Sequence, residues 1–394
     1  MTKKVLFIHH CGIFGGASRS LGELIKSIPT GQVNPIIISQ QGTAANYFEK
    51  LGFKVFRVSG LSKFDITELG YYKGLRWLVI LRELFYLPTT LGIILKVKKL
   101  HPDISLIHIN DIQDFLLVFI TKKIFRVPVV IHIRGPLMKR KGFRYRFLMW
   151  TLKNRLDAVI AIDETVNNSI DRSVKSKIIH NGFITKCLLD QDINNDILTI
   201  GMVSNLLRFK GVLDFVEAAR ICKKIDMKAR FIILGGKDEQ KHGLINSLLM
   251  VFGFQHDIQD EVFQRIRKYG LQDNFFIYPF SEDISSFYRS ISVLCFPSHI
   301  NAVGRPVFEA GYHQVPSIVA ISDPKSDAII HMQTGICIEE KNPQSLASAI
   351  LHFYNDRNEI NRMGKNALRL VSENYNISRN AEKLMTEYNQ LVKE

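Results

Sequence analysis

One pattern recurs along most of this chain: a short apolar run, then a loop, then a stretch with helical spacing of its apolar residues. The runs are short and rich in β-branched and aromatic residues, which favours strands buried on both faces. Strands that alternate with helices form a parallel sheet covered on both sides, so the expected fold class is α/β. The predicted strands are 5–8, 35–39, 54–58, 104–109, 127–135, 158–162, 176–182, 198–203, 230–236, 274–278, 291–296, 315–321 and 335–338.

The strands fall into two series, which predicts two domains. A length of 394 residues is about what two domains need. The stretch 189–196 between the series is polar and poor in helix-forming residues, as is typical of an interdomain link. It contains Asp190 and Asp192, whose spacing occurs in metal sites, but no buried strand precedes them. A metal site is therefore not favoured there.

A loop with Gly304 and Pro306 follows the predicted strand 291–296, and a helical pattern begins behind it. A strand, a glycine loop and a helix N-terminus together suit an anion, because free backbone N–H groups and the helix dipole converge there. Arg305 adds a positive charge, and Glu309, expected in the first helical turn, adds an acceptor for sugar hydroxyls. Such turns also occur as plain scaffold, so both interpretations stay open.

The first strand leads into a second glycine loop, which contains Gly15 and Gly16 and is followed by a helical pattern over 18–28. Glycine allows a ligand to approach the backbone closely. The loop lacks the G-x-G-x-x-G spacing, and no acidic residue ends the second strand where a dinucleotide ribose would lie. A nicotinamide dinucleotide is therefore not the predicted ligand.

The stretch 297–311 resembles the nucleotide-sugar signature of retaining GT-B glycosyltransferases of the family 4 type, also called glycosyl transferases group 1. In that family a Glu, a Phe-Gly loop and a second Glu eight positions on hold the donor. Gly304 and Glu309 match the loop glycine and the second Glu, which implies a ribose contact for Glu309. Asn301 and Val303 stand at the first Glu and the Phe. An amide can hydrogen-bond a sugar hydroxyl, but it does not stabilise positive charge as a carboxylate does.

The loop 204–211 resembles the family loop that carries a cation and a Lys-Gly pair. Lys210 matches the family lysine, whereas Asn205 stands at the usual arginine, so Arg208 is the expected substitute. When the glycosidic bond to the nucleotide breaks, negative charge builds on the β-phosphate, and cations in a partly dry site neutralise it. A surface ion pair is the alternative for Arg208.

Residues at the carboxyl ends of the first-half strands are further candidates, because ligands gather at that edge of a parallel sheet. Gly15, Gly16 and Ala17 match the family loop that faces the donor phosphates and the acceptor. His132 matches a strand-end histidine that reaches the donor sugar, although a histidine on a strand can equally be structural. Arg134 suits the diphosphate or an acceptor phosphate.

Two weaker candidates, His108 and Asn110, end the neighbouring strand. Asn181 and Gly182 lie in a His-Asn-Gly turn that resembles the family's Pro-Asn-Gly, and they are predicted to form a tight turn with positive φ.

The resemblance implies two Rossmann-like, doubly wound domains facing a cleft, at 1–183 and 197–370, with 371–394 as a C-terminal helix packing back towards the first domain. The segment 237–269 is longer than usual and is interpreted as an insertion of unknown purpose. The predicted catalytic residues are Arg208, Lys210, His132 and Asn301; the donor-binding residues are Gly15, Gly16, Ser204, Gly304, Arg305, Pro306 and Glu309; the acceptor-side residues are Ala17 and Arg134.

The implied reaction transfers a sugar from a nucleotide diphosphate sugar to an acceptor hydroxyl with retention. The resemblance implies no metal, no cofactor and no firmly established protein nucleophile. Bacterial polysaccharide or lipid-linked glycan assembly is the expected setting. Two alternatives stay open: a UDP-sugar epimerase of the same fold, and a non-catalytic module that binds sugar nucleotides or membranes.

A formal charge of +15 favours anionic partners. A basic run with interleaved aromatic residues includes Lys139, Arg140, Lys141, Arg144 and Arg146. It is either a solvated helix face or a surface that lies on anionic lipid. No nucleic-acid-binding signature accompanies the charge, so nucleic acid is not a predicted partner.

The most membrane-like window, 77–95, is interrupted by Arg82, Glu83 and Pro88, so buried helices are expected there instead of a span. Five scattered cysteines without a C-x-x-C pair suggest reduced thiols and no zinc site. The apolar start of the chain is too short for a signal peptide. The expected location is cytoplasmic, with peripheral attachment to the inner face of the plasma membrane as a hypothesis.

Overall fold

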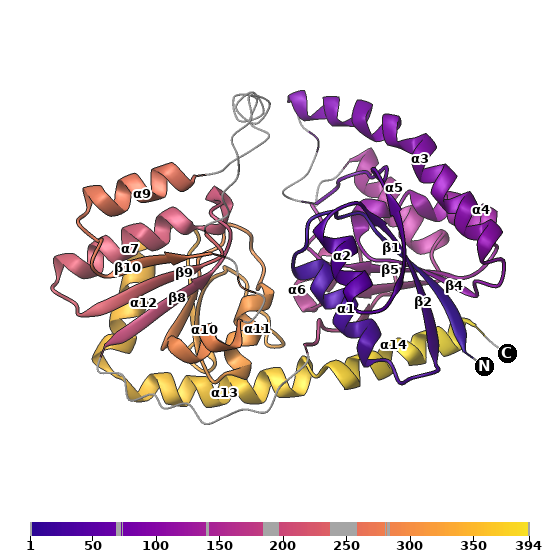
Figure 1. Cartoon of the computed structure of the whole chain (residues 1–394). Helices are drawn as coiled ribbons and strands as arrows, with labels where there is room; N and C mark the ends of the chain where they lie inside the picture. The colour runs from indigo at the N-terminus through magenta and orange to yellow at the C-terminus, as the bar shows by residue number, and fades with distance from the viewer. Residues whose placement is uncertain are drawn as a thin grey trace. The chain divides into compact units, whose positions relative to one another are not determined.

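The computed structural model describes residues 2–67, 72, 74–138, 142–183, 197–236, 258–279, 281 and 284–392. These residues form two compact units (Figure 1). Unit 1 comprises Met1–Ile184 with Tyr375–Glu394, and unit 2 comprises Thr185–Asn374. The predicted link 189–196, with Asp190 and Asp192, and most of the predicted insertion lie outside the described residues.

Unit 1 contains a seven-stranded sheet in the order β3-β2-β1-β4-β5-β6-β7, and every recorded strand pair is parallel. Leu6 of β1 pairs with Ile36 on one side and with Ile107 on the other. The strand order reverses between β1 and β4, where the carboxyl ends of strands leave room for a ligand. The strands are β1 (Lys3–His9), β2 (Val33–Gln40), β3 (Lys54–Val58), β4 (Leu106–Ile109), β5 (Val129–Ile133), β6 (Ala158–Ala161) and β7 (Lys177–Ile178).

Helices cover both faces of this sheet. On one face Leu21, Leu24 and Leu384 pack with Phe7, and on the other Ile94 and Leu148 belong to the same core as Ile107. The helices of the first face are α1 (Gly16–Ser27), α2 (Thr43–Lys50) and α14 (Ile377–Leu391). Those of the second are α3 (Val79–Leu100), α4 (Leu117–Phe125), α5 (Phe143–Asn154) and α6 (Glu164–Ser169), with the 3₁₀ turns η1 (Gly74–Leu78) and η2 (Ile112–Asp114).

Unit 2 contains a six-stranded sheet in the order β10-β9-β8-β11-β12-β13, again with parallel pairs. Its order reverses between β8 and β11, where Val293 pairs with Ile200. The strands are β8 (Leu198–Val203), β9 (Ala229–Leu234), β10 (Phe275–Tyr278), β11 (Val293–Phe296), β12 (Ser317–Ala320) and β13 (Gly335–Ile338).

The largest core of unit 2 lies under three helices and is centred on the packed rings of Phe215, Phe231 and Phe275. On the other side α11 packs on α13, where a Cβ added at Gly311 would lie 3.1 Å from a methyl carbon of Val371. The helices over the core are α7 (Val212–Lys224), α9 (Gln259–Lys268) and α12 (Pro343–Asn355). The others are α10 (Ser285–Ser290), α11 (Arg305–Tyr312) and α13 (Asn358–Asn374), and the turn η3 spans Arg208–Lys210.

The α/β prediction with two parallel sheets is confirmed. The expectation of buried helices over 77–95 is wrong for the first turns of α3, because Leu81 is 64% exposed and Phe85 is 76% exposed. The segment 371–394 is not a single helix: α13 ends at Asn374 in unit 2, and α14 begins at Ile377 in unit 1. No helix in the described part of the chain has the length and apolar character needed to cross a bilayer.

Candidate active site

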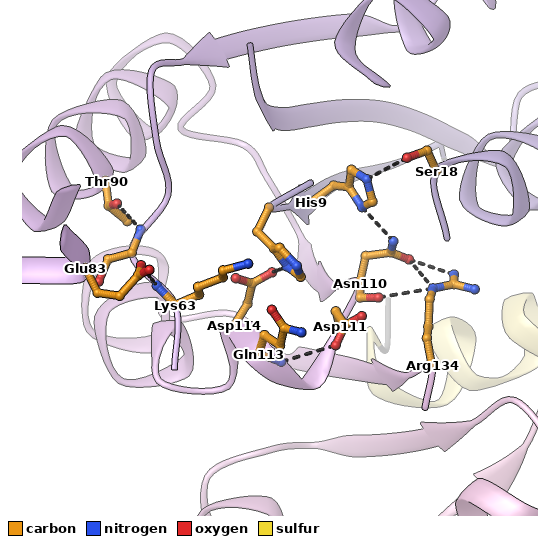
Figure 2. Close-up of polar contacts among 12 residues, drawn as sticks. His9, Ser18, Lys63, Glu83, Thr90, Asn110, Asp111, Gln113, Asp114 and Arg134 are labelled. Atoms are coloured by element: carbon orange, nitrogen blue, oxygen red, sulfur yellow. Dashed lines mark hydrogen bonds and ion pairs between the residues drawn. The ribbon is translucent and has the colours of Figure 1, made fainter. Parts of the chain in front are cut away.

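A hydrogen-bonded chain of side chains lies at the carboxyl edge of the unit 1 sheet (Figure 2). His9 ends β1, and its Nδ1 lies 2.9 Å from Nδ2 of Asn110, the residue after β4. Since that amide nitrogen is a donor, Nδ1 accepts, and Nε2–H donates to Ser18 Oγ of α1 at 2.9 Å. Burial lowers the pKa of His9 well below its ordinary value, and His10 and Arg134 lower it further, so the ring is neutral.

Arg134 follows β5, and its guanidinium is held by amide and carbonyl oxygens. Nε donates to the backbone oxygen of Asn110 at 3.1 Å and to its Oδ1 at 2.9 Å, and Nη2 donates to the same Oδ1 at 2.6 Å. Nη1 donates to Oδ1 of Asn181 at 2.7 Å. These partners are neutral, and the charge of Arg134 lowers the pKa values of three histidines around it. The edge therefore presents an oriented positive charge.

A second pair at this edge was not predicted from the sequence. His10 Nδ1 lies 2.9 Å from Asp114 Oδ2, and both side chains are buried. Burial lowers the pKa of His10, but the charge and hydrogen bond of Asp114, with a contribution from Cys11, raise it well above its ordinary value overall. The raised pKa favours the imidazolium form of His10 beside Asp114. The sequence gives one sign of it, the His-His dipeptide at the end of the first strand.

The predicted phosphate loop is open at its glycines. Gly15 and Gly16 are exposed, Ala17 is half-buried, and a Cβ added at either glycine would have no heavy atom within 4 Å. The steric need for glycine lies instead at Gly12 and Gly42, where a Cβ on Gly42 would lie 2.3 Å from the carbonyl oxygen of Gly12. Contacts of Gly15, Gly16 and Ala17 with a substrate stay a prediction.

His132 is the last residue but one of β5, and its side chain is buried. It lies within β5, is 1% exposed, and shares its face of the sheet with Val130, which packs in the core beneath α14. Its ring centroid lies 5.5 Å from that of His108, whose Nδ1 is 2.7 Å from the hydroxyl of Tyr388. Burial lowers the pKa of His132 well below its ordinary value. Arg134, two residues on, takes the edge position, so this geometry gives His132 a core role.

Asn181 and Gly182 do not form the predicted turn, because neither has a positive φ. Gly182 is required for another reason: an added Cβ would lie 2.5 Å from the Cα of Ile377, where α14 begins. Asn181 serves the edge by accepting from Arg134.

Lys210 is the central cation of the unit 2 edge. Its Nζ lies 5.3 Å from the ring centroid of Phe209 and 6.0 Å from that of Phe296. Burial lowers the pKa of Lys210, and no carboxylate in the described ranges pairs with it. Gly211 behind it has φ +74°, and an added Cβ would lie 1.9 Å from the carbonyl oxygen of Pro297. Glycine therefore lets η3 rest against the loop after β11.

That loop leads to the predicted donor residues. A Cβ on Gly304 would lie 2.4 Å from Cζ of Phe296, so the same ring neighbours both Lys210 and Gly304. Helix α11 begins at Arg305, and Pro306 is in its first turn, where its missing N–H costs nothing. The loop and η3 are thus brought together around one phenylalanine.

Glu309 is the fifth residue of α11, one turn later than expected, and is 7% exposed. Its Oε1 accepts from Arg305 Nε at 2.6 Å, and its Oε2 accepts from the hydroxyl of Tyr288 at 2.9 Å. The carboxylate is therefore oriented by two side chains of its own unit. The predicted ribose contact would add to these bonds.

The remaining predicted residues have local partners. Asn301 Oδ1 accepts from the backbone N–H of Ser322 at 3.0 Å, so this amide ties the loop after β11 to the loop after β12. The hydroxyl of Ser204 donates to the backbone oxygen of Asn205 at 2.7 Å.

Arg208 pairs with Glu261 of α9, which is the surface ion pair left open from the sequence. It lines a pocket of about 600 Å³ with Phe209, Leu213, Asp214, Arg265, His299 and Lys341. None of these residues belongs to α10 or α11, so the described contacts do not bring Arg208 to Glu309. A leaving-group role for Arg208 stays a prediction. Among the described residues no group of three or more His, Cys, Asp and Glu side chains is arranged to hold a metal.

Comparison with known protein families covers most of the chain. The model "Glycosyltransferase Family 4" matches residues 14–186, and the model "Glycosyl transferases group 1" matches residues 190–370. The capsular polysaccharide biosynthesis glycosyltransferase CapM of Staphylococcus aureus is 24% identical over 297 residues, which cover 70% of this chain and 73% of CapM.

Solved structures share the fold over nearly the full length. Anabaena Alr3699/HepE, in a complex with UDP-glucose, superposes with a TM-score of 0.74 at 19% identity, covering 98% of this chain and all of that one. TarM of S. aureus superposes with a TM-score of 0.72 at 14% identity, covering 98% of this chain and all of that one. The two matched models and the two parallel α/β units show that the chain belongs to the GT-B glycosyltransferases of the group 1 and family 4 type.

Proposed function

We propose that the protein transfers a hexosyl or related sugar from a nucleoside diphosphate sugar to a hydroxyl group of a glycan or lipid-linked acceptor, with retention at the anomeric carbon. Family membership supports the reaction class. The HepE structures contain UDP and UDP-glucose, which supports a nucleotide sugar as donor. CapM acts in capsular polysaccharide biosynthesis, which supports a glycan product.

The observation that carries this proposal is the half-buried ammonium of Lys210, which lies beside two aromatic rings and has no carboxylate partner in the described structure. A desolvated cation is costly unless an anion completes the site. A nucleoside diphosphate supplies that anion, and its charge grows as the sugar leaves. The stabilisation by Lys210 is therefore greatest in the transition state, which is where it accelerates the reaction.

In the proposed step the bond between the anomeric carbon and the β-phosphate oxygen breaks, and its electron pair stays on the diphosphate. The acceptor oxygen forms the new bond on the same face, and its proton passes to a diphosphate oxygen. Lys210 neutralises the leaving diphosphate, with Arg208 as a predicted second cation. The step uses no metal, so a chelator is expected to leave the rate unchanged.

The donor is proposed to bind along the unit 2 edge. The start of α11 faces the diphosphate through backbone N–H groups that include those of Gly304 and Arg305, and Pro306, which has no N–H, fixes the first turn. Glu309 accepts from the ribose hydroxyls, and the amide nitrogen of Asn301 donates to a sugar hydroxyl. In unit 1, Gly15, Gly16, Ala17 and Arg134 are proposed to contact the acceptor and the outer donor phosphate.

The test is a thermal-shift panel of UDP, GDP and ADP and their glucose conjugates on the full chain, followed by product analysis. A nucleotide at about a hundredfold its Kd stabilises the fold by about 2.7 kcal/mol. We expect one nucleotide to stand out, and its sugar conjugate to be consumed when an acceptor is added. An epimerised sugar released without acceptor would identify the epimerase alternative. Stabilisation without turnover would identify a binding module.

We propose that this reaction takes place at the cytoplasmic face of the plasma membrane. The basic run supports this setting through Arg144 and Arg146 on α5, whereas Lys139, Arg140 and Lys141 lie outside the described residues.

A further inference from the structure

Helix α3 buries two of its polar side chains, Glu83 and Thr90. Glu83 is buried, and its Oε2 accepts from the backbone N–H of Lys63 at 2.9 Å (Figure 2). Thr90 is also buried, and its hydroxyl accepts from the backbone N–H of Ser62 at 2.8 Å. These side chains fix the segment that follows β3, so the inner face of this half of α3 is used for hydrogen bonding.

The outer face of α3 carries large apolar side chains. Leu78, Leu81, Leu84, Phe85 and Leu95 are between 54% and 76% exposed. Their spacing of three, four and seven residues places most of them on one stripe. A surface helix of a globular protein normally turns such a stripe towards the core. In the first half of α3 the apolar stripe faces outward instead. The sequence pattern shows the stripe but not its direction, so it suggested burial.

The start of α5 lies beside the start of this stripe. The Arg144 guanidinium lies 4.9 Å from the centroid of the Trp77 ring in η1, and Arg144 Nη1 donates to the backbone oxygen of Tyr72 at 3.1 Å. Phe143 is 76% exposed and Trp150 is 43% exposed on the same helix as Arg144. The α3–α5 surface is defined by Trp77, Leu78, Leu81, Leu84, Phe85, Phe143 and Trp150. Exposed apolar groups clustered in this way mark an interaction surface.

Charge indicates what covers the α3–α5 surface. The segments 74–100 and 143–154 together contain eight lysines and arginines and one acidic residue, Glu83, which is buried. A second copy of the chain would bring the same positive field against itself. Anionic lipid instead offers negative headgroups for the cations and an apolar layer for the leucines, with tryptophans suited to the boundary.

We propose that the α3–α5 surface lies on an anionic membrane, with its apolar side chains in the interface and its cations among the headgroups. The helices lie in the plane of the membrane surface and do not cross it. Membrane binding by this surface would place the enzyme where a lipid-linked acceptor is found. Its biological purpose rests on the proposed function, but the binding itself does not.

The first test measures binding of the full chain to vesicles of phosphatidylcholine with about a third phosphatidylglycerol, by co-sedimentation. The variant Leu84→Gln/Phe85→Gln keeps the charge and the helix, because glutamine is a good helix former. We expect its vesicle partition to fall by about tenfold or more, since two inserted side chains are lost. The matched control, Ile225→Gln/Met332→Gln, replaces two exposed apolar residues of unit 2 and is expected to bind as the parent does.

The second test uses the tryptophans as built-in probes. The chain has two, Trp77 and Trp150, and both belong to the α3–α5 surface. Adding the vesicles should shift their fluorescence to shorter wavelength, and the shift should be absent in Leu84→Gln/Phe85→Gln. Salt should weaken binding through the screening of the cations, and replacing phosphatidylglycerol by phosphatidylcholine should weaken it further.

The proposal is overturned if the parent chain does not sediment with these vesicles, or if Leu84→Gln/Phe85→Gln binds them equally well. It is also overturned if the parent is a dimer in solution that this variant dissociates, because a second copy then covers the surface. Nucleotide stabilisation separates this from the proposed function. Both variants are expected to be stabilised by UDP or GDP as the parent is. If the parent is not stabilised by any nucleotide, that result counts against the transferase proposal alone.

Discussion

The two sheet edges hold their cations in opposite ways. In unit 1, Arg134 is fixed by four hydrogen bonds to oxygens of Asn110 and Asn181, and its charge acts on a group of neutral histidines. In unit 2, Lys210 is bordered by the rings of Phe209 and Phe296 and loses hydration without a carboxylate partner among the described residues. The first arrangement secures geometry, and the second leaves charge to be neutralised by a ligand. We therefore expect losses at Arg134 to affect folding and activity together, and losses at Lys210 to affect activity alone.

The largest expected effect is that of Lys210→Ala. Removing one positioned donor to a developing anion typically lowers kcat by about 10²–10³. The melting temperature should stay level or rise, because a poorly solvated charge is removed. Kinetics and thermal melts on the same preparation test this. Lys224→Ala, an exposed lysine of α7, is the control, and a Lys210→Ala enzyme with parental kcat would contradict the leaving-group role.

Replacement of Arg134 by methionine is expected to cost about 2–3 kcal/mol of unfolding free energy, since amide oxygens buried at the edge lose a charged donor. Turnover should fall as well. Arg134→Lys should recover little, because an ammonium cannot reproduce the forked contact with Asn110. Urea unfolding together with kcat measures both quantities. If either variant lost activity with unchanged stability, the contrast with Lys210 would disappear.

A glycine pair compares the loops of the two edges. Gly211→Ala should destabilise the protein by about 1–3 kcal/mol, because its φ is positive and the new methyl would meet Pro297. Gly15→Ala should change the unfolding free energy by under about 0.5 kcal/mol, since its backbone is extended and its surroundings are open. Denaturant midpoints test both, and donor KM then reports whether Gly15 approaches a substrate.

The last prediction concerns the pH dependence of stability. Burial lowers the pKa of His108 to about 3, and the pKa of His132 is also lowered, whereas the unfolded value is about 6.5. The unfolded chain therefore binds more protons between these values, and stability present above pH 6.5 falls as the pH drops. His132→Phe removes one of these titrating groups. The slope of the unfolding free energy against pH should therefore fall by up to about 1.4 kcal/mol per pH unit. His10 acts in the opposite sense, because the stability from its raised pKa is lost only as pH rises above 6.5. Thermal melts of the parent and of His132→Phe from pH 7 to pH 4 test this. If the variant shows the same dependence of stability on pH as the parent, groups other than His132 cause it.

Sequence patterns were sufficient for features that depend on neighbours along the chain. The apolar runs predicted both sheets, and Lys210, Gly304 and Glu309 were proposed as site residues because each lies in a short motif after a strand. The pair of His10 and Asp114 was missed, since its members are separated by 104 residues and meet only through strand order.

The orientation of α3 could not be read from its periodicity either. Spacing indicates which side chains share a face, but not whether that face turns inward, and Glu83 and Thr90 decide the matter through contacts with the segment after β3. The same limit of sequence patterns applies to strand β5. His132 packs in the core, whereas Arg134, two residues later, lies at the edge of the sheet.

Helix α14 has a consequence for how the protein is made. The hydroxyl of Tyr388 bonds His108 across 280 residues, so the face of the first sheet that α1 and α2 cover in part is completed only by the end of the chain. At ribosomal rates of about 5–20 residues per second, the roughly 200 residues between the N-terminal part of unit 1 and α14 take about 10–40 s to emerge. During that interval part of the apolar face of the nascent N-terminal unit is exposed to other chains. In a chain truncated before Asn376, that part of the face would stay exposed.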